Sequence, residues 1–245
     1  STIDGDLTLT SGHASGITDS GTVTVGGNFS ATTDANSGVI NMGTMAVDGT
    51  FTLAPNSTGA VTIVNDAGLN LAASTLGGTF SGTATTGNIT DSGALAITGT
   101  TTLVTSANDA TIALDTTTNA FTGALTITTN DASGTDADVT IDGGTTALII
   151  AASTIDGDLT LTSGHASGIT DSGTVTVGGN FAATTDANSG VIDLDTMAVD
   201  GTVGLNTNGT GAATIVNDAG INFAASTVGG VLSATATTGD ITDSG

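Results

Sequence analysis

The chain has 245 residues, contains no lysine, arginine or cysteine, and carries a formal net charge of −23. Without cationic side chains it has nothing to displace the counterions of nucleic acid or to hold an anionic membrane surface, so neither is expected as a partner. The absence of cysteine removes disulfides and zinc–thiolate sites, and no apolar run reaches the length of a transmembrane helix.

The residue types favour β-structure. Glu and Gln are absent as well as Lys and Arg, so most strong helix formers are missing. The abundant Thr, Ser, Gly, Asn and Asp favour turns and caps, and a hydrophobic content of 38% is enough to build a core. We therefore expect an all-β protein with many tight turns.

Short strands are expected along the whole chain. The frame Gly-x-apolar-x-apolar predicts strands within residues 5–9, 21–25, 43–47, 93–97 and 123–127. In each frame, apolar side chains alternate with small or polar ones, which is the period of a strand with one buried face. The intervening TDSG, VDGT and NDAG segments are turn sequences, because Asp or Asn bonds nearby backbone and Gly adopts positive φ.

A long repeat organises these strands. Residues 1–29 return unchanged at 153–181, a period of 152 residues. We interpret the chain as one continuous segment, 1–245, that holds a long repeat, 1–152, and a partial second copy, 153–245. Neither end resembles a terminal cap with a polar outer face. We therefore expect the chain to be a segment of a longer protein or a subunit capped by its neighbours.

The spacing of the strands predicts a parallel β-helix. Gly21 and Gly43 begin equivalent strands 22 residues apart, a suitable length for one coil that stacks on the next. At about 4.8 Å per coil, some 11 coils would form a rod roughly 50 Å long. A β-sandwich also accommodates short alternating strands, but the long repeat and the scarcity of aromatic core residues argue against it. The expected fold is an all-β parallel β-helix, or β-solenoid.

Two strings carry a family resemblance. GDLTLTSG at residues 5–12 and ITDSGTVTVGGNF at 17–29 resemble repeats of filamentous-haemagglutinin-like and autotransporter-type bacterial surface proteins. The resemblance implies a right-handed β-helix, export across the outer membrane, and roles in adhesion, cell-surface coats or biofilm. The chain departs from such proteins in lacking basic residues.

Clustered Asp residues are candidate calcium ligands, because calcium prefers several oxygen ligands. Neither EF-hand spacing nor the GGxGxD pattern of calcium β-rolls is present, and solvated turn acids are the favoured alternative. The candidates form two turns and one run: Asp4 and Asp6, their copies Asp156 and Asp158, and Asp131, Asp136, Asp138 and Asp142.

The two histidines occupy the same place in the two copies. His13 and His165 both lie in the string SGHASG. A metal ligand or a pH-sensitive contact is one interpretation. A turn residue carried along by duplication is the favoured one, because a lone imidazole without Cys, Glu or a second nearby His is a weak metal site.

Thr-x-Thr segments, such as Thr8-Leu-Thr10 and Thr126-Ile-Thr128, would place hydroxyl groups on the outer face of the solenoid. A flat array of such groups is typical of ice-binding solenoids, whereas ordinary β-propensity explains single segments equally well. Outward Thr and Asp faces are therefore the alternative functional surface, for ice or a glycan.

We expect a structural role. Polysaccharide lyases with similar architecture use Arg or Lys, and paired-acid glycosidases usually need aromatic platforms, neither of which this composition supplies, so we expect no enzyme. The sequence favours an extracellular filament or a cell-surface stalk or adhesin that polymerises with itself end to end or continues as a longer tandem-repeat chain. A surface receptor or glycan is a further possible partner, and no cofactor is expected unless calcium binds.

Overall fold

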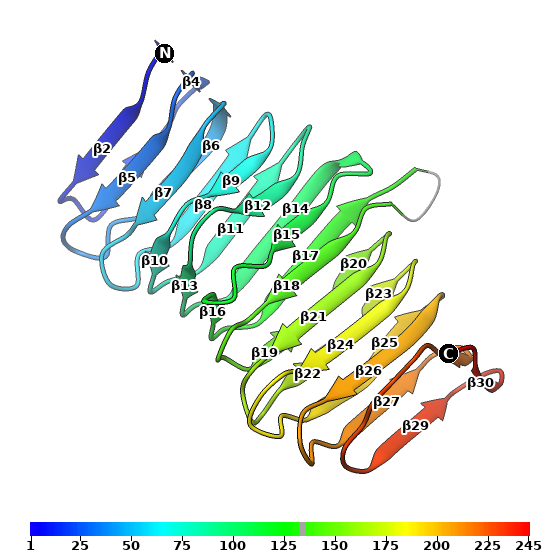
Figure 1. Cartoon of the computed structure of the whole chain (residues 1–245). Helices are drawn as coiled ribbons and strands as arrows, with labels where there is room; N and C mark the ends of the chain where they lie inside the picture. The colour runs from blue at the N-terminus through cyan, green and yellow to red at the C-terminus, as the bar shows by residue number, and fades with distance from the viewer. Residues whose placement is uncertain (133–135) are drawn as a thin grey trace.

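The computed structural model describes residues 1–132 and 136–245, which form 30 β-strands and no helix. The strands follow one another as the coils of a solenoid of about 11 turns (Figure 1), as the sequence predicts. Each coil contributes one strand to a sheet that we call sheet B and one or two strands to the opposite sheet A. No helix in the described ranges is long and apolar enough to cross a membrane.

Sheet B runs from one end of the described chain to the other and holds twelve strands. They are β2 (Leu7–Ser11), β5 (Phe29–Thr33), β7 (Thr50–Ala54), β9 (Leu69–Leu71), β12 (Ile89–Asp91), β15 (Ile112–Leu114), β18 (Val139–Asp142), β21 (Leu159–Ser163), β24 (Phe181–Thr185), β26 (Thr202–Thr207), β28 (Ile221–Phe223) and β30 (Ile241–Asp243).

Sheet A holds fifteen strands on the other side of the core. They are β1 (Thr2–Ile3), β3 (Ile17–Thr18), β4 (Val23–Val25), β6 (Ile40–Val47), β8 (Val61–Asn65), β11 (Phe80–Ala84), β14 (Thr101–Asn108), β17 (Leu125–Asn130), β19 (Leu148–Ile150), β20 (Ser153–Ile155), β22 (Ile169–Asp171), β23 (Val175–Val177), β25 (Ile192–Val199), β27 (Ala213–Asn217) and β29 (Leu232–Ala236). A three-stranded sheet C adds β10 (Ser74–Leu76), β13 (Leu95–Ile97) and β16 (Ala120–Phe121).

All pairings between these strands are parallel, and their register gives the coil length. Leu7 lies opposite Phe29, and Phe29 lies opposite Phe51, so these two steps along the chain are equal. The next step is shorter, because Phe51 lies opposite Leu71. The predicted coil length is confirmed, since successive turns lie ~22 residues apart. The local shortening is a feature that the strand frames do not indicate.

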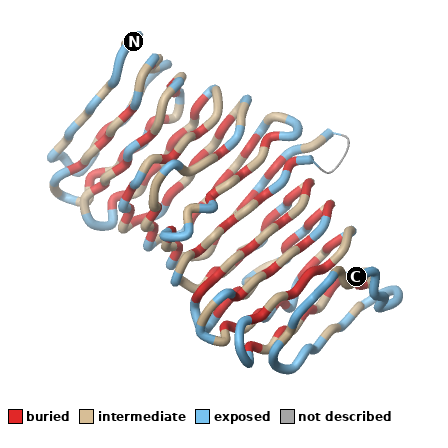
Figure 2. The backbone as a smooth tube through the Cα atoms, in the orientation of Figure 1, coloured by how far each residue is buried: buried red, intermediate tan, exposed pale blue. Residues whose placement is uncertain are grey.

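The hydrophobic core lies between the sheets and runs along the axis. In strands such as β8 and β24, buried and half-buried residues alternate (Figure 2), so that Val61, Ile63 and Phe181 face inward and the residues that follow them are partly exposed. The rings of Phe29 and Phe51 stack edge to face, with centroids 5.8 Å apart. Each fully buried side chain of this size stabilises the fold by about 1.5–3 kcal/mol, and the neighbouring coils provide part of that burial.

A buried asparagine lies in one shortened coil of each copy. Asn65 is fully buried, and its Oδ1 accepts a hydrogen bond from the Val47 N–H (2.9 Å). Its Nδ2 donates to the carbonyls of Val47 (3.0 Å) and Gly68 (2.6 Å). The side chain therefore pairs with Val47 as a strand residue would. Asn217 makes the same three bonds in the second copy.

Candidate functional site

The Asp-Gly-Asp turns belong to hydrogen-bonded ladders at one corner of the solenoid. Asp6 Oδ1 accepts a bond from the Asn28 N–H (2.7 Å), and Asn28 Oδ1 accepts bonds from the N–H (2.9 Å) and hydroxyl (3.0 Å) of Thr50. In the second copy, Asp158 and Asn180 play the same parts. These side chains join each coil to the next, and the bonds engage one carboxylate oxygen of Asp6.

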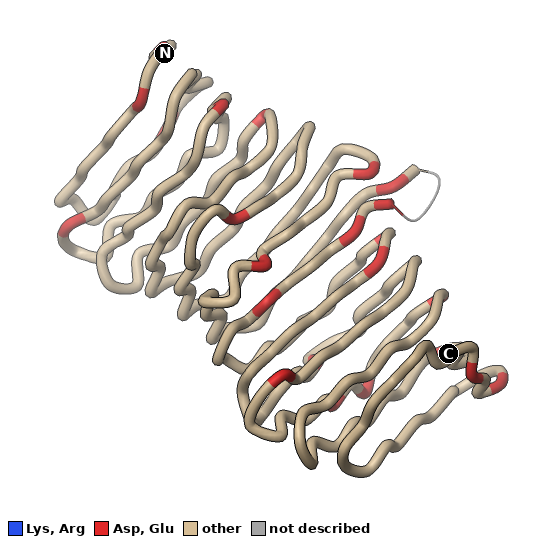
Figure 3. The backbone as a smooth tube through the Cα atoms, in the orientation of Figure 1, with Lys and Arg blue, Asp and Glu red and all other residues tan. Residues whose placement is uncertain are grey.

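The candidate calcium residues of the middle coils separate into two groups. Asp138 Oδ1 accepts the Asp158 N–H (2.8 Å) and so extends the corner ladder. Asp156 Oδ2 accepts the Asp131 N–H (2.8 Å) at the neighbouring turn. Asp4 is exposed at its own turn. Figure 3 shows the acidic residues mostly at corners, spread along the length of the rod.

An acid that the sequence reasoning missed lies beside Asp131. Desolvation raises the pKa of Asp109, and hydrogen bonding to Asp131 together with repulsion from Asp131 and Asp136 raises it further. Asp109 is distant from these residues in sequence but lies one coil away. No group of three or more Asp or His residues in 1–132 and 136–245 is arranged to hold a metal ion. Calcium binding thus stays a prediction.

The ITDSG motif has a structural role in both copies. Asp19 Oδ1 accepts the Gly43 N–H (3.0 Å), and its Oδ2 accepts the N–H (2.7 Å) and the hydroxyl (2.6 Å) of Thr44. Partial burial raises the pKa of Asp19, but the bonds from Thr44 and Gly43 outweigh that effect and hold the pKa below its usual value. Asp171 binds the backbone of Asp195 and Thr196 in the same way.

Each histidine closes its own turn. His13 Nδ1 accepts the Ser15 N–H (3.1 Å), and His165 Nδ1 accepts the Ser167 N–H (3.0 Å). The carbonyl of His13 also accepts the Gly16 N–H (2.8 Å). These contacts support the turn interpretation, because the ring nitrogen that faces the protein is already bonded.

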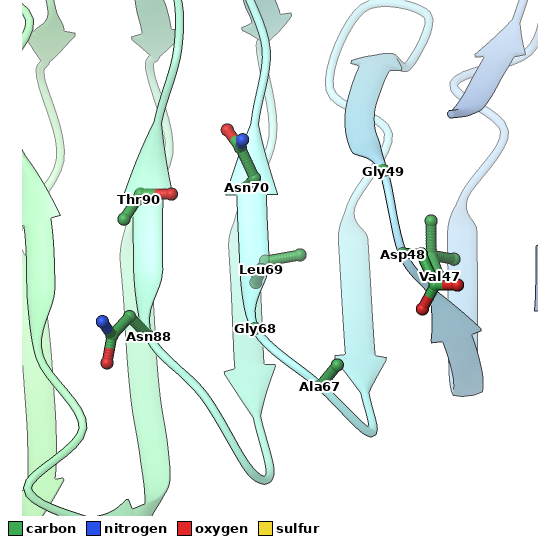
Figure 4. Close-up of a pocket in the computed structure, with 9 residues that line it drawn as sticks. All are labelled: Val47, Asp48, Gly49, Ala67, Gly68, Leu69, Asn70, Asn88 and Thr90. Carbon is green, nitrogen blue, oxygen red and sulfur yellow. The ribbon is translucent and has the colours of Figure 1, made fainter. Parts of the chain in front are cut away.

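A surface groove recurs in both copies at the corner where sheet A passes into sheet B. The first has a volume of about 260 Å³ and the second about 240 Å³. Every lining position of the first returns 152 residues later in the second, with one change in chemistry, Asn88 to Asp240. We call these the corner grooves (Figure 4). The first is lined by Val47, Asp48, Gly49, Ala67, Gly68, Leu69, Asn70, Asn88 and Thr90.

A second pair of grooves lies at the bulge of β6 and of its copy β25. The first has about 260 Å³ and more apolar lining, and it recurs with the same 152-residue offset. Gly43 becomes Asp195 between the copies. The lining of the first is Thr22, Gly43, Thr44, Met45, Val64, Asp66 and Thr85. The long repeat therefore preserves surface hollows as well as the core.

One family model matches most of the chain. It is described as repeats of unknown function (DUF5649) and matches residues 58–128, 136–206 and 210–245. The chain belongs to this family of repeats. No curated protein and no solved structure matches it. The family and the fold support a repeat β-helix protein, whereas the resemblance to filamentous haemagglutinins and autotransporters stays an expectation.

The family units reveal a half-repeat that the sequence analysis missed. The first and third units begin one long repeat apart, at positions 58 and 210, and the second begins near the midpoint, at position 136. Each long repeat thus contains two units. The string AAST at residues 72–75, 151–154 and 224–227 follows nearly the same spacing and could have disclosed them. The two halves differ at most other positions, so the half-repeat is weak in the sequence.

Proposed function

We propose that this chain is a stiff rod segment of an extracellular filament or cell-surface stalk, built from tandem β-solenoid repeats. The observation that carries the proposal is the uninterrupted ladder of sheet B from β2 to β30, backed by a core that is continuous along the axis. A structure of this kind resists bending, because any bend must break parallel pairings and open the core at once. The absence of Lys and Arg also makes the chain inert to trypsin-like proteases.

The last coil supports association with a further coil. In the last coil, Val231, Leu232 and Ile241 are 74%, 44% and 51% exposed. The edge strands there present backbone groups suited to pairing with another strand. The proposed partner is another solenoid coil, from a second copy end to end or from further repeats of a longer chain. The same rod has no catalytic role in this proposal, since its histidines are engaged in turns.

Length measurements test the rod. A chain extended by further 152-residue repeats is expected to lengthen by about 34 Å per repeat in small-angle scattering and electron microscopy, at about 4.8 Å per coil. A radius of gyration that grows as for a compact globule would overturn the proposal. Antibody labelling of intact cells, compared with permeabilised cells, tests the surface location separately.

A second candidate function rests on the outer face of sheet A. Four outward hydroxyl residues stand opposite one another on successive coils: Thr62, Ser81, Thr102 and Thr126. Such a column could order water as an ice-binding face does. Thermal hysteresis of the chain tests this candidate, and Thr102→Lys is expected to abolish it, whereas Thr160→Lys on sheet B leaves it unchanged. No hysteresis in the unmodified chain rules the candidate out.

A further inference from the structure

We propose that the corner groove is a binding site for one unit of a neutral, hydroxyl-rich saccharide, repeated once per long repeat. The role goes beyond the rod and does not depend on it, because the groove exists within three successive coils. These are the turn before β7, the turn into β9, and the start of β12.

Glycines form part of the wall of the groove. A Cβ on Gly49 would lie only 2.5 Å from the Gly27 carbonyl oxygen of the preceding coil. The chain must therefore use glycine at this position of the wall. Val47 and Leu69 are buried beneath the groove. Figure 4 shows Asn70, Asn88 and Thr90 on neighbouring strands around this space.

Polar groups with unused capacity line the groove. Asn70 and Thr90 stand opposite each other on the outer face of sheet B. Asn70 Oδ1 is buried and has no hydrogen-bond partner among the described residues. Asn88 Oδ1 accepts the Thr111 N–H (2.9 Å), which leaves its NH₂ group to donate. Asp48 adds an exposed carboxylate at the rim. The site thus offers acceptors and donors side by side.

The neighbouring hydroxyls of a sugar fit this set, because one donates to Asn70, another donates to Asp48, and their oxygens accept from Asn88. An anionic ligand does not, since the chain has a net charge of −23 and no Lys or Arg. A calcium ion needs six to eight oxygen ligands, and the first corner groove supplies one carboxylate. A volume of about 260 Å³ lies below the roughly 300 Å³ of pockets for drug-sized ligands, which suits a single sugar unit.

The spacing of the two corner grooves points to a polymeric ligand. Seven steps of sheet B separate β9 from β28, so the grooves lie about 34 Å apart along the rod at about 4.8 Å per coil. The groove is open and contains no aromatic residue, so a single unit binds weakly. A polysaccharide that reaches both grooves gains affinity through effective concentration.

The two corner grooves differ in the polar groups that they offer to a neutral sugar. Asp240 replaces Asn88 and removes the NH₂ donor. In addition, Asn222 Oδ1 already accepts a bond from the Thr242 hydroxyl (3.3 Å). The first corner groove should therefore bind a neutral sugar more tightly than the second.

The test uses the full chain with amide-resolved NMR and a panel of neutral probes: glucose, mannose, galactose and N-acetylglucosamine, each with a soluble homopolymer. At least one sugar is expected to shift the side-chain NH₂ signals of Asn70 and Asn88 more than those of Asn222. Asn70→Leu should weaken binding by about 2- to 10-fold, the loss of one neutral hydrogen bond. Asp240→Asn should strengthen the second groove, and Asn41→Leu on sheet A is the matched control.

Several outcomes would overturn the proposal. They are no shift with any neutral sugar, equal shifts in the Asn70→Leu variant, or shifts produced by calcium alone. A homopolymer that binds the Asn70→Leu, Asn222→Leu double variant as tightly as the unmodified chain would also refute it. Circular dichroism and the melting temperature show whether each variant folds. If the Asn70→Leu variant does not fold, the Asp240→Asn variant still tests the site. The proposal of a rod is tested by the length measurements, so its outcome is independent of these binding experiments.

Discussion

Identical sequences in the two copies have different environments. The segment LTLTS forms β2 near one end, where its apolar residues are only half-buried, and β21 in the interior, where they are fully buried. The reverse holds at the other end, where β29 is largely exposed although β11, its counterpart, is buried. The same strand therefore has a core only when a coil lies on each side of it. Burial in this molecule is a property of the stack and not of the repeat.

The largest expected effect comes from deleting one buried leucine in each environment. Leu161→Ala should lower the free energy of unfolding by about 2–5 kcal/mol, because it leaves a cavity between packed coils. Leu9→Ala, the same position in β2, should cost only about 1 kcal/mol, since that side chain is half-exposed already. Denaturant titration of both variants measures the difference. Equal losses would mean that the end coil is packed as tightly as the interior.

The buried asparagine should come next. Asn65→Ala leaves the N–H and C=O of Val47 and the C=O of Gly68 without a partner, which should destabilise the fold by about 1–3 kcal/mol. Asn217→Ala should cost a similar amount in the second copy. The control is Asn41→Ala, because Asn41 is exposed, and it should change the unfolding midpoint little. If all three variants behave alike, the buried side chains do not support the shortened coils.

A smaller effect separates the corner ladder from calcium binding. Asp158→Asn keeps the oxygen that accepts the Asn180 N–H, just as asparagine serves at position 28, so stability should be unchanged. Asp158→Ala removes the acceptor and should cost about 1 kcal/mol. Both results should be the same with calcium and with a chelator. A calcium-dependent loss of stability in Asp158→Asn would instead identify a metal site.

The smallest expected effects are those of pH. Burial and repulsion from Asp186, Asp115 and Asp91 raise the pKa of Asp142 despite a hydrogen bond from the Gly144 N–H. The folded chain therefore takes up a proton before the unfolded chain does, and stability rises as pH falls through that raised pKa. The lowered pKa of Asp19 has the opposite effect on stability. The ionised Asp19 carboxylate stabilises the folded chain at neutral pH, and this stabilisation is lost as pH falls through the pKa of Asp19 in the folded chain.

Thermal melts across pH should consequently show a rise from pH 7 towards about pH 5 and a fall below about pH 3. Asp142→Asn should flatten the rise, and Asp19→Asn should flatten the fall. Added salt at pH 7 should also raise the melting temperature, because it screens the uncompensated negative charge. A melting temperature that declines steadily from pH 7 would contradict the assignment for Asp142.

Much of the architecture could be predicted from local pattern. The frames at residues 21–25 and 93–97 are strands β4 and β13, with the predicted alternation. The shortening of the coil at Asn65 could not be predicted, since nothing in NDAG distinguishes a buried Asn from a solvated one. The candidate site was only partly predictable. Asp6 and Asp158 lie at turns as expected, but their hydrogen bonds to the next coil depend on the register between coils.

By itself the sequence determined the β-structure, the coil length and the long repeat, because alternation, turn residues and periodicity are local properties of the chain. Only the tertiary structure decided which neighbours each residue meets. It brought Asp109 beside Asp131, placed Asn65 in the core, and joined turns from three coils into the corner groove. The physical reason is that contacts between coils link residues that are a whole turn apart in the chain, and the length of each coil decides which residues meet.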